Sequence, residues 1–220
     1  MIVPTFNSYA VPNIASSASF YFTDFPLTEN PLSEGGVWTN GLSVGLDWTD
    51  VQSGNGVAFR TQSVHAPPPY DDSIACLSSF PPNHYAQGIV SRAGDSGELE
   101  IELLLRWKIT AHSARGYEID IINNGNVYIV RWNGALNDFT ILSGPTASSS
   151  NNGDVWYGEV VGTVITVKRN GTTVATYDTA GDVTKWSDGN PGIGFYTDNS
   201  LGAPSAGSTY SWTSFTSAAL

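Results

Sequence analysis

Carboxylate and guanidinium side chains are concentrated in one stretch of the sequence, between residues 98 and 131. They are Glu100, Glu102, Arg106, Glu118, Asp120 and Arg131. If three neighbouring strands carry them, alternation along each strand turns them toward one face of a sheet. Paired carboxylates and arginines on such a face bind sugars through bidentate hydrogen bonds, or they form a solvated lattice of ion pairs. Both interpretations stay open at this point.

Three aromatic residues lie in or beside loops that also carry acidic side chains. They are Trp48, Tyr70 and Trp186. An aromatic ring packs against the apolar face of a pyranose while neighbouring Asp, Asn and Arg side chains reach its hydroxyls. We therefore predict these three residues as candidate ligand contacts. Trp107 and Trp156 lie in alternating stretches instead, which predicts positions in the core.

The only metal suggested by the residues is calcium, which prefers six to eight oxygen ligands. Asp71 and Asp72 are the first candidates for a structural calcium site, and Asp24 with nearby carbonyls is another. The histidines, His65, His84 and His112, have no spacing typical of zinc ligands. No G-x-S-x-G nucleophile motif and no phosphate-cradling motif is present either.

The elements that position these residues are predicted to be strands, because hydrophobicity alternates with a period of two. The clearest case runs from Gly97 to Ile109, and residues 117–121 repeat the pattern. Asn-Gly pairs near 124 and 170 predict hairpins. Further strands are expected at 18–25, 42–48, 56–63, 73–79, 86–93, 127–132, 138–142, 154–161, 160–178, 192–198 and 208–217. We predict an all-β, two-sheet antiparallel jelly-roll sandwich forming a single domain over residues 1–220.

Composition and charge limit the classes of partner. The 220 residues carry 20 acidic and 9 basic side chains, giving a net charge of −11. Neither nucleic acid nor an anionic membrane is expected as a partner, because both attract basic surfaces. The single cysteine, Cys76, lies in an apolar run and is predicted to be a core residue. No signal peptide is visible between Met1 and Phe20.

The order of several segments resembles the concanavalin A-like lectin and glucanase superfamily, particularly its laminin-G-like members. These segments are Phe20–Phe25 before Trp38, the strand at 97–109, Arg115–Ile119, Ile129–Gly134, Asp154–Trp156, Arg169–Gly171 and Gly189–Phe195, with Trp212 and Phe215 near the end. The resemblance implies a β-sandwich, a fold that hosts lectins, glycosidases, lyases, adhesion modules and virion proteins. Members often carry a calcium ion.

Superfamily members that cleave β-glucans with retention carry an E-x-D-x-x-E motif. In this resemblance Glu118 matches the nucleophile and Asp120 the helper residue, but Asn123 stands at the acid/base position and cannot donate and recover a proton. We therefore expect a non-catalytic, lectin-like binding or structural module. We expect it on an extracellular or virion surface, for example as a phage decoration or fibre-associated protein. Its partners would be glycans or neighbouring protein subunits. The alternative is a glycan-active hydrolase or lyase with displaced catalytic residues.

Overall fold

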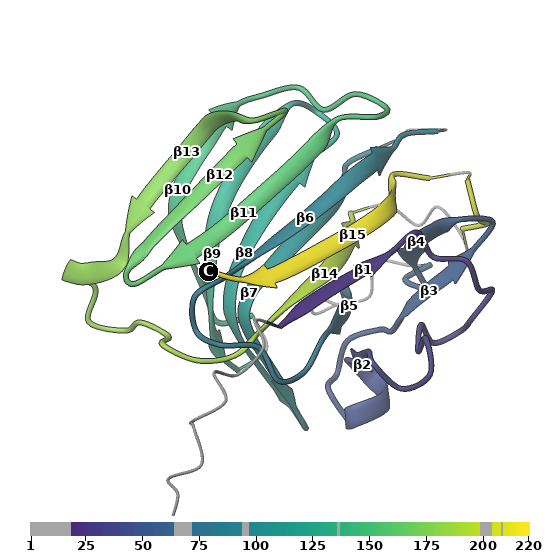
Figure 1. The fold of residues 1–220 in the computed structure, drawn as a ribbon, viewed down its shortest axis with the longest axis horizontal. Helices are drawn as coiled ribbons and strands as arrows, with labels where there is room; N and C mark the ends of the chain where they lie inside the picture. The colour runs from purple at the N-terminus through teal and green to yellow at the C-terminus, as the bar shows by residue number, and fades with distance from the viewer. Residues whose placement is uncertain (1–18, 64–71, 94–96, 136, 199–203, 208) are drawn as a thin grey trace, which may run out of the picture.

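The structure is a computed structural model that describes residues 19–63, 72–93, 97–135, 137–198, 204–207 and 209–220. In these residues the chain forms two layers of strands packed face to face (Figure 1). Its helical segments there are two short 3₁₀ turns, η1 (Leu42–Val44) and η2 (Thr179–Gly181). None of the described helical segments has the length and apolar character needed to cross a membrane.

The first sheet is antiparallel. Its strands are β1 (Phe20–Thr23), β3 (Val51–Gly54), β4 (Val57–Arg60), β6 (His84–Ser91), β11 (Val155–Val161), β12 (Val164–Arg169), β13 (Thr172–Asp178) and β15 (Ser211–Ala219). Their spatial order is β13-β12-β11-β6-β15-β4-β3, and β1 pairs with β15. This sheet faces the viewer in Figure 1.

The second sheet is antiparallel as well and lies behind the first. Its strands are β2 (Thr39–Asn40), β5 (Ser73–Cys76), β7 (Leu99–Thr110), β8 (Ser113–Ile122), β9 (Asn126–Gly134), β10 (Phe139–Ala147) and β14 (Asn190–Thr197). Their order is β10-β9-β8-β7-β14-β5-β2. The predicted all-β sandwich of two antiparallel sheets is therefore confirmed.

The main core lies between the sheets. Alternation turns Ile101, Leu103 and Leu105 of β7 inward, where they join Trp156 and Phe215 of the first sheet. A second apolar cluster lies on the outer face of the second sheet, by which we mean the face turned away from the first sheet. It contains Leu46, Trp48, Ile74, Cys76, Leu104, Trp107, Ala114, Val130 and Trp132. Trp107, Trp156 and Cys76 are buried, as predicted.

Local sequence explains two turns. Asn170 and Gly171 both have positive φ, 50° and 79°, which is the conformation that a type I′ hairpin requires between β12 and β13. The strand predicted at 42–48 is wrong. Gly41 begins the turn η1 and Gly45 ends it with φ 84°, so the apolar side chains of Leu42 and Val44 point to solvent instead of alternating across a sheet.

Candidate functional site

The outer face of the second sheet gathers the acidic side chains predicted as ligand-binding residues. Pairing places Glu102 of β7 opposite Asp120 of β8, and Glu118 opposite Leu104. In this register Glu100, Glu102, Glu118 and Asp120 lie on the same face, since the residues between them enter the core between the sheets. Asp72 joins them from the residue just before β5.

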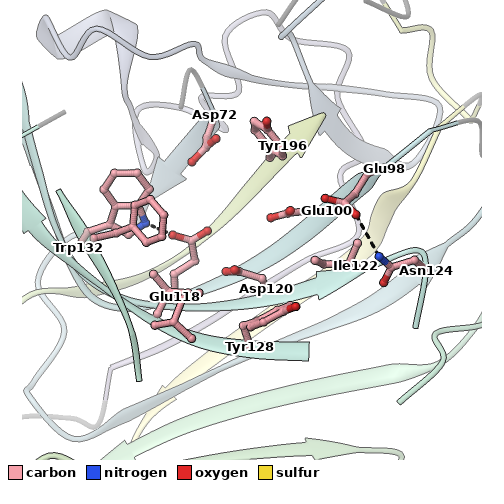
Figure 2. A pocket seen from close by; sticks show the side chains of 13 residues that line it. Asp72, Glu98, Glu100, Glu118, Asp120, Ile122, Asn124, Tyr128, Trp132 and Tyr196 are labelled. Atoms are coloured by element: carbon pink, nitrogen blue, oxygen red, sulfur yellow. Dashed lines mark hydrogen bonds between the residues drawn. The ribbon is translucent and has the colours of Figure 1, made fainter. Parts of the chain in front are cut away.

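All of these carboxylates except the fully buried Glu102 line a pocket of about 270 Å³ (Figure 2). It is lined by Asp72, Glu98, Glu100, Glu118, Asp120, Ile122, Asn124, Tyr128, Val130, Trp132, Phe139, Ile141 and Tyr196. Carboxylates occupy the middle, Tyr128 and Tyr196 flank them, and the apolar side chains of β9 and β10 form one wall. The pocket therefore combines hydrogen-bonding groups with partly exposed aromatic rings.

One carboxylate is fixed by the aromatic wall. The Nε1–H of Trp132 donates a hydrogen bond to Oε2 of Glu118, drawn as a dashed line in Figure 2. Trp132 itself packs edge-on against Trp48, with ring centroids 4.6 Å apart, and lies 5.3 Å from Phe139. The indole is held in place on two sides, so the orientation of the Glu118 carboxyl group is set by packing.

The pocket is acidic without a basic counterpart. Among the described residues that line it there is no lysine, arginine or histidine. Burial raises the pKa values of Glu100, Glu102 and Glu118 well above their usual range, and the neighbouring carboxylates raise them further. Burial also raises the pKa of Asp120 to about 7. Either protons or a bound cation must therefore balance the negative charge.

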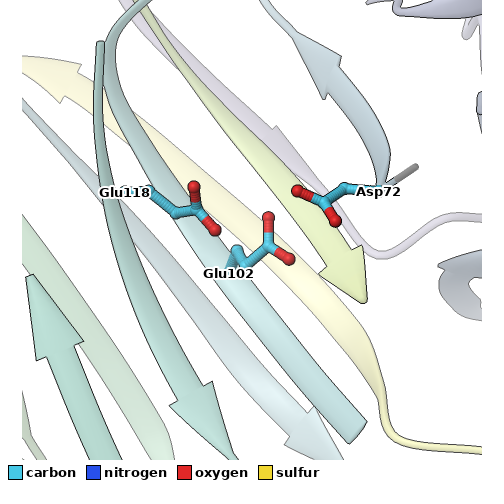
Figure 3. Close-up of side chains that lie close together, drawn as sticks. All are labelled: Asp72, Glu102 and Glu118. Atoms are coloured by element: carbon cyan, nitrogen blue, oxygen red, sulfur yellow. The ribbon is translucent and has the colours of Figure 1, made fainter. Parts of the chain in front are cut away.

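Three of these carboxyl groups are placed as ligands of one ion would be. Asp72, Glu102 and Glu118 each offer an oxygen within 4.8 Å of the others (Figure 3). Glu100, Glu118 and Asp120 form a second, overlapping group with the same limit. Asp72 was predicted as a metal ligand from the sequence. Asp71, predicted with it, lies outside the described residues.

The prediction that Arg106 and Arg131 share this face is wrong. Two residues of β7, Arg106 and Trp107, lie opposite Gly116 in a β-bulge, and Arg106 has φ 49°. The bulge turns Trp107 outward and Arg106 toward the first sheet, where its guanidinium donates to the carbonyls of Pro82, Trp186 and Gly162.

Arg131 lies on the opposite face for a different reason. It pairs with Tyr117, a core residue between the sheets, and not with Glu118. Its guanidinium donates to the carbonyl of Thr184 at 2.7 Å and reaches Asp182 at 3.5 Å. Both predicted arginines therefore have structural partners away from the pocket.

Two of the three predicted aromatic platforms, Trp48 and Trp186, do not line the pocket. Trp48 is 2% exposed and forms part of the outer-face apolar cluster, beneath Trp132. One face of the Trp186 ring is covered by the guanidinium of Arg115, 4.5 Å from the ring centroid. Its indole nitrogen donates to the carbonyl of Trp132. Tyr70 lies outside the described residues.

The aromatic residues that do line the pocket were missed. Tyr128 and Trp132 lie on β9, Phe139 begins β10, and Tyr196 pairs with Glu100 across β14 and β7. The alternation Tyr128-Val130-Trp132 was present in the sequence as a signal. The sequence alone does not match the face of β8 that carries Glu118 to a face of β9, because that match depends on the register between the strands.

Asn123 does not enter the pocket as an acid/base residue would. Its side chain accepts from the backbone N–H of Leu99 and donates to the carbonyl of Gly97. Ile122, one residue earlier, lines the pocket in regular alternation with Glu118 and Asp120. Neither residue at this end of β8 carries a carboxyl group.

Comparison with solved structures supports the fold. The chain is similar to the β-glucanase of Bacillus licheniformis (12% identity, covering 93% of this chain and 100% of that chain, TM-score 0.54). It is similar to the β-porphyranase of the gut bacterium Bacteroides plebeius (12%, 94% and 94%, TM-score 0.53). A carbohydrate-binding module from Bacillus subtilis matches as well (14%, 76% and 91%, TM-score 0.50).

Sequence comparison adds no closer relationship. No family model matches the chain, and no curated protein matches it significantly. At identities of 12–14% the structural matches concern the fold alone. That fold agrees with the resemblance inferred from the order of the sequence segments: the chain has a concanavalin A-like, jelly-roll β-sandwich fold.

Proposed function

We propose that the pocket on the outer face of the second sheet binds a glycan. The observation that carries this proposal is the combination of partly exposed tyrosines with a group of carboxylates in one pocket. Tyr128 and Tyr196 offer aromatic faces to the apolar side of a sugar ring, and Glu100 and Asp120 offer acceptors to its hydroxyls. Structural neighbours that are described as glucanase, porphyranase and carbohydrate-binding module support this choice of ligand class.

The proposed binding does not include cleavage of β-glucans. Retaining hydrolysis needs an acid/base carboxyl besides the nucleophile. Ile122, the last residue of β8, and Asn123 just after it hold the positions where such a group would follow Glu118 and Asp120. The Asn123 amide is engaged with backbone groups. A lectin-like role follows from this arrangement.

A glycan array that includes β-glucans tests the proposal. We expect binding by the wild type and a loss of about thirtyfold in affinity, ~2 kcal/mol, in Tyr128→Ala or Tyr196→Ala. Tyr85→Ala is the matched control, because Tyr85 lies on β6 and stacks on Tyr157, outside the pocket. Equal binding by all three variants, or none by the wild type, contradicts the proposal.

A second candidate is a glycoside hydrolase with displaced catalytic residues. It is favoured by the second cluster of carboxylates, because oxygens of Glu100, Glu118 and Asp120 lie within 4.8 Å of one another. Retaining enzymes hold two carboxyl groups about 5–5.5 Å apart. Release of reducing sugar from a glycan bound on the array, abolished in Glu118→Gln, would replace the lectin by this hydrolase.

We further propose that the protein acts on an exposed surface, extracellular or on a virion, as a decoration or fibre-associated protein. Its net charge of −11, with only three lysines, suits a solvent-facing β-protein. Neighbouring subunits would then be partners besides glycans. Mass spectrometry of purified particles tests this, and absence from all particle and extracellular fractions would contradict it.

A further inference from the structure

We propose that Asp72, Glu102 and Glu118 hold a hard divalent cation of the calcium type at the base of the pocket. The cation would make glycan binding metal-dependent, and this second part rests on the proposed function. Figure 3 shows the three carboxyl groups converging from the start of β5, from β7 and from β8. No two of them come from the same strand, so the fold itself brings them together.

The distances suit one ion. One oxygen from each of the three residues lies within 4.8 Å of the other two. Oxygens on opposite sides of a calcium ion lie about 5 Å apart, because Ca–O distances are roughly 2.3–2.6 Å. Three carboxylates supply up to six oxygens, and calcium accepts six to eight. The remaining positions are open to water or to neighbouring hydroxyls of a sugar.

The environment of the Glu102 carboxyl group points to a bound ligand. Its side chain is 0% exposed, and neither carboxylate oxygen has a hydrogen-bond partner among the described residues. A buried carboxylate without a partner is costly, by several kcal/mol. The charged neighbours that act on Glu102, chiefly Asp72, Asp120 and Glu100, are acidic and increase this cost. A cation between Glu102, Asp72 and Glu118 removes it.

The absence of a side chain at Gly194 of the neighbouring strand β14 leaves space for the Glu102 carboxyl group. Gly194 of β14 lies opposite Glu102, between β7 and β5. A side chain at this position would overlap the Glu102 carboxyl group. Asp72 is fixed on its own side, since its carbonyl accepts hydrogen bonds from the N–H and the hydroxyl of Thr49. The ligand positions are therefore determined by the backbone on both sides of the gap.

The chemistry of the ligand set selects the class of ion. All three ligands are carboxylates, and the described residues around them contribute no sulfur or imidazole ligand to either group. Zinc and copper sites use such ligands, whereas calcium prefers oxygen alone. We expect a single calcium ion with an affinity between micromolar and millimolar.

Isothermal titration calorimetry with calcium chloride on chelator-treated full-length protein tests the site. We expect one calcium per chain and a loss of affinity of about tenfold or more, ~1.4 kcal/mol, in Glu102→Gln and in Asp72→Asn. Glu159→Gln is the matched control, because Glu159 pairs with Lys168 on the first sheet. Circular dichroism shows whether each variant folds. If Glu102→Gln does not fold, the calcium affinity of Asp72→Asn decides the test.

Two results overturn the cation site: no calcium binding by the folded wild type, or wild-type affinity in both folded pocket variants. The glycan array, run with calcium and with chelator, separates this proposal from the glycan site. Calcium binding without any glycan signal upholds the cation and refutes the glycan. Glycan binding by protein that binds no calcium upholds the glycan site and refutes the cation site. Glycan binding unchanged by chelator, in protein that binds calcium, refutes the metal dependence alone.

Discussion

Gly194 and Glu102 are packed so closely that a Cβ atom on Gly194 would overlap the Glu102 carboxyl group in its present position. A Cβ atom placed on Gly194 would overlap Oε2 of Glu102 and lie 2.9 Å from its carboxyl carbon. The contact is with the functional end of the side chain. The space that a Cβ would fill is therefore the space into which the Glu102 carboxyl group extends.

This contact predicts the effect of Gly194→Ala. The new methyl group should displace the Glu102 carboxyl from the other ligands and lower calcium affinity by about tenfold or more, while overpacking costs ~1–3 kcal/mol of stability. Calorimetry and chemical denaturation measure the two effects. Gly181→Ala is the control, because a Cβ there meets no atom within 4 Å. Unchanged affinity in a folded Gly194→Ala protein would show that the Glu102 position is not needed.

The bond between Trp132 and Glu118 predicts a second effect. Trp132→Phe keeps an aromatic ring beside Trp48 but leaves the Glu118 carboxyl without the indole donor. We expect the free energy of unfolding to fall by ~1–3 kcal/mol more than in Trp107→Phe, measured by urea denaturation. Trp107 is the matched control because it lies in the same apolar cluster and its Nε1 has no partner among the described residues. Equal losses would show that the hydrogen bond adds nothing.

The sequence was sufficient to predict the sheets, because strand alternation and Asn-Gly turns are local signals. Residues 97–109 and the turn at Asn170-Gly171 show this, since both follow from side chains within a few positions. The segment 42–48 shows the limit. Two exposed apolar residues, Leu42 and Val44, mimic alternation, and only the backbone of Gly45 ends the turn.

The site was predicted only in part, because faces depend on register. Glu102, Glu118 and Asp120 meet as expected, since regular alternation runs through both strands. Arg106 leaves the face at a bulge, and a one-residue change in alternation reverses every side chain beyond it. The face on which Arg131 lies depends on its cross-strand partner, which is Tyr117, a residue of the core between the sheets. Long-range pairing fixes these positions, and no local pattern reports it.

Burial of the Asp120 carboxyl group predicts that Asp120→Asn stabilises the cation-free protein at high pH. The pKa of Asp120 is raised to about 7 from an ordinary 3.8, so the folded state resists its ionisation and stability falls as pH rises between these values. Removing this charge should therefore raise the free energy of unfolding at pH 8 by ~1–3 kcal/mol, with little gain at pH 4. Urea denaturation in chelator measures it.

The control for this experiment is Asp138→Asn, because Asp138 lies outside the pocket and bonds Asn133 in the turn between β9 and β10. It should show no gain that grows with pH. Stabilisation of Asp120→Asn that is the same at pH 4 and at pH 8 would mean that the charge of Asp120 is not the cause.

The buried, neutral ring of His84 leads us to predict that the protein loses stability in mild acid. Its Nδ1 bonds the carbonyl of Pro81 at 2.7 Å, and its Nε2 accepts the backbone N–H of Arg106 at 3.1 Å. Only a neutral ring can do both, because a proton on Nε2 would face another N–H. Burial, chiefly, lowers the pKa of His84 from 6.5 to about 4.

The sign of the effect follows from proton uptake. Between these pKa values the unfolded chain binds a proton that the folded chain does not, so stability is full above pH 6.5 and falls toward pH 4, by up to ~3 kcal/mol. Denaturation of wild type and His84→Asn across this range isolates the contribution, because the carboxylates are common to both proteins. We expect the difference between them to shrink as pH falls. His112→Asn, which alters an exposed histidine beside Asp47, is the control and should follow the wild type. A constant difference between wild type and His84→Asn from pH 7 to pH 4 would show that His84 is not held neutral by this contact.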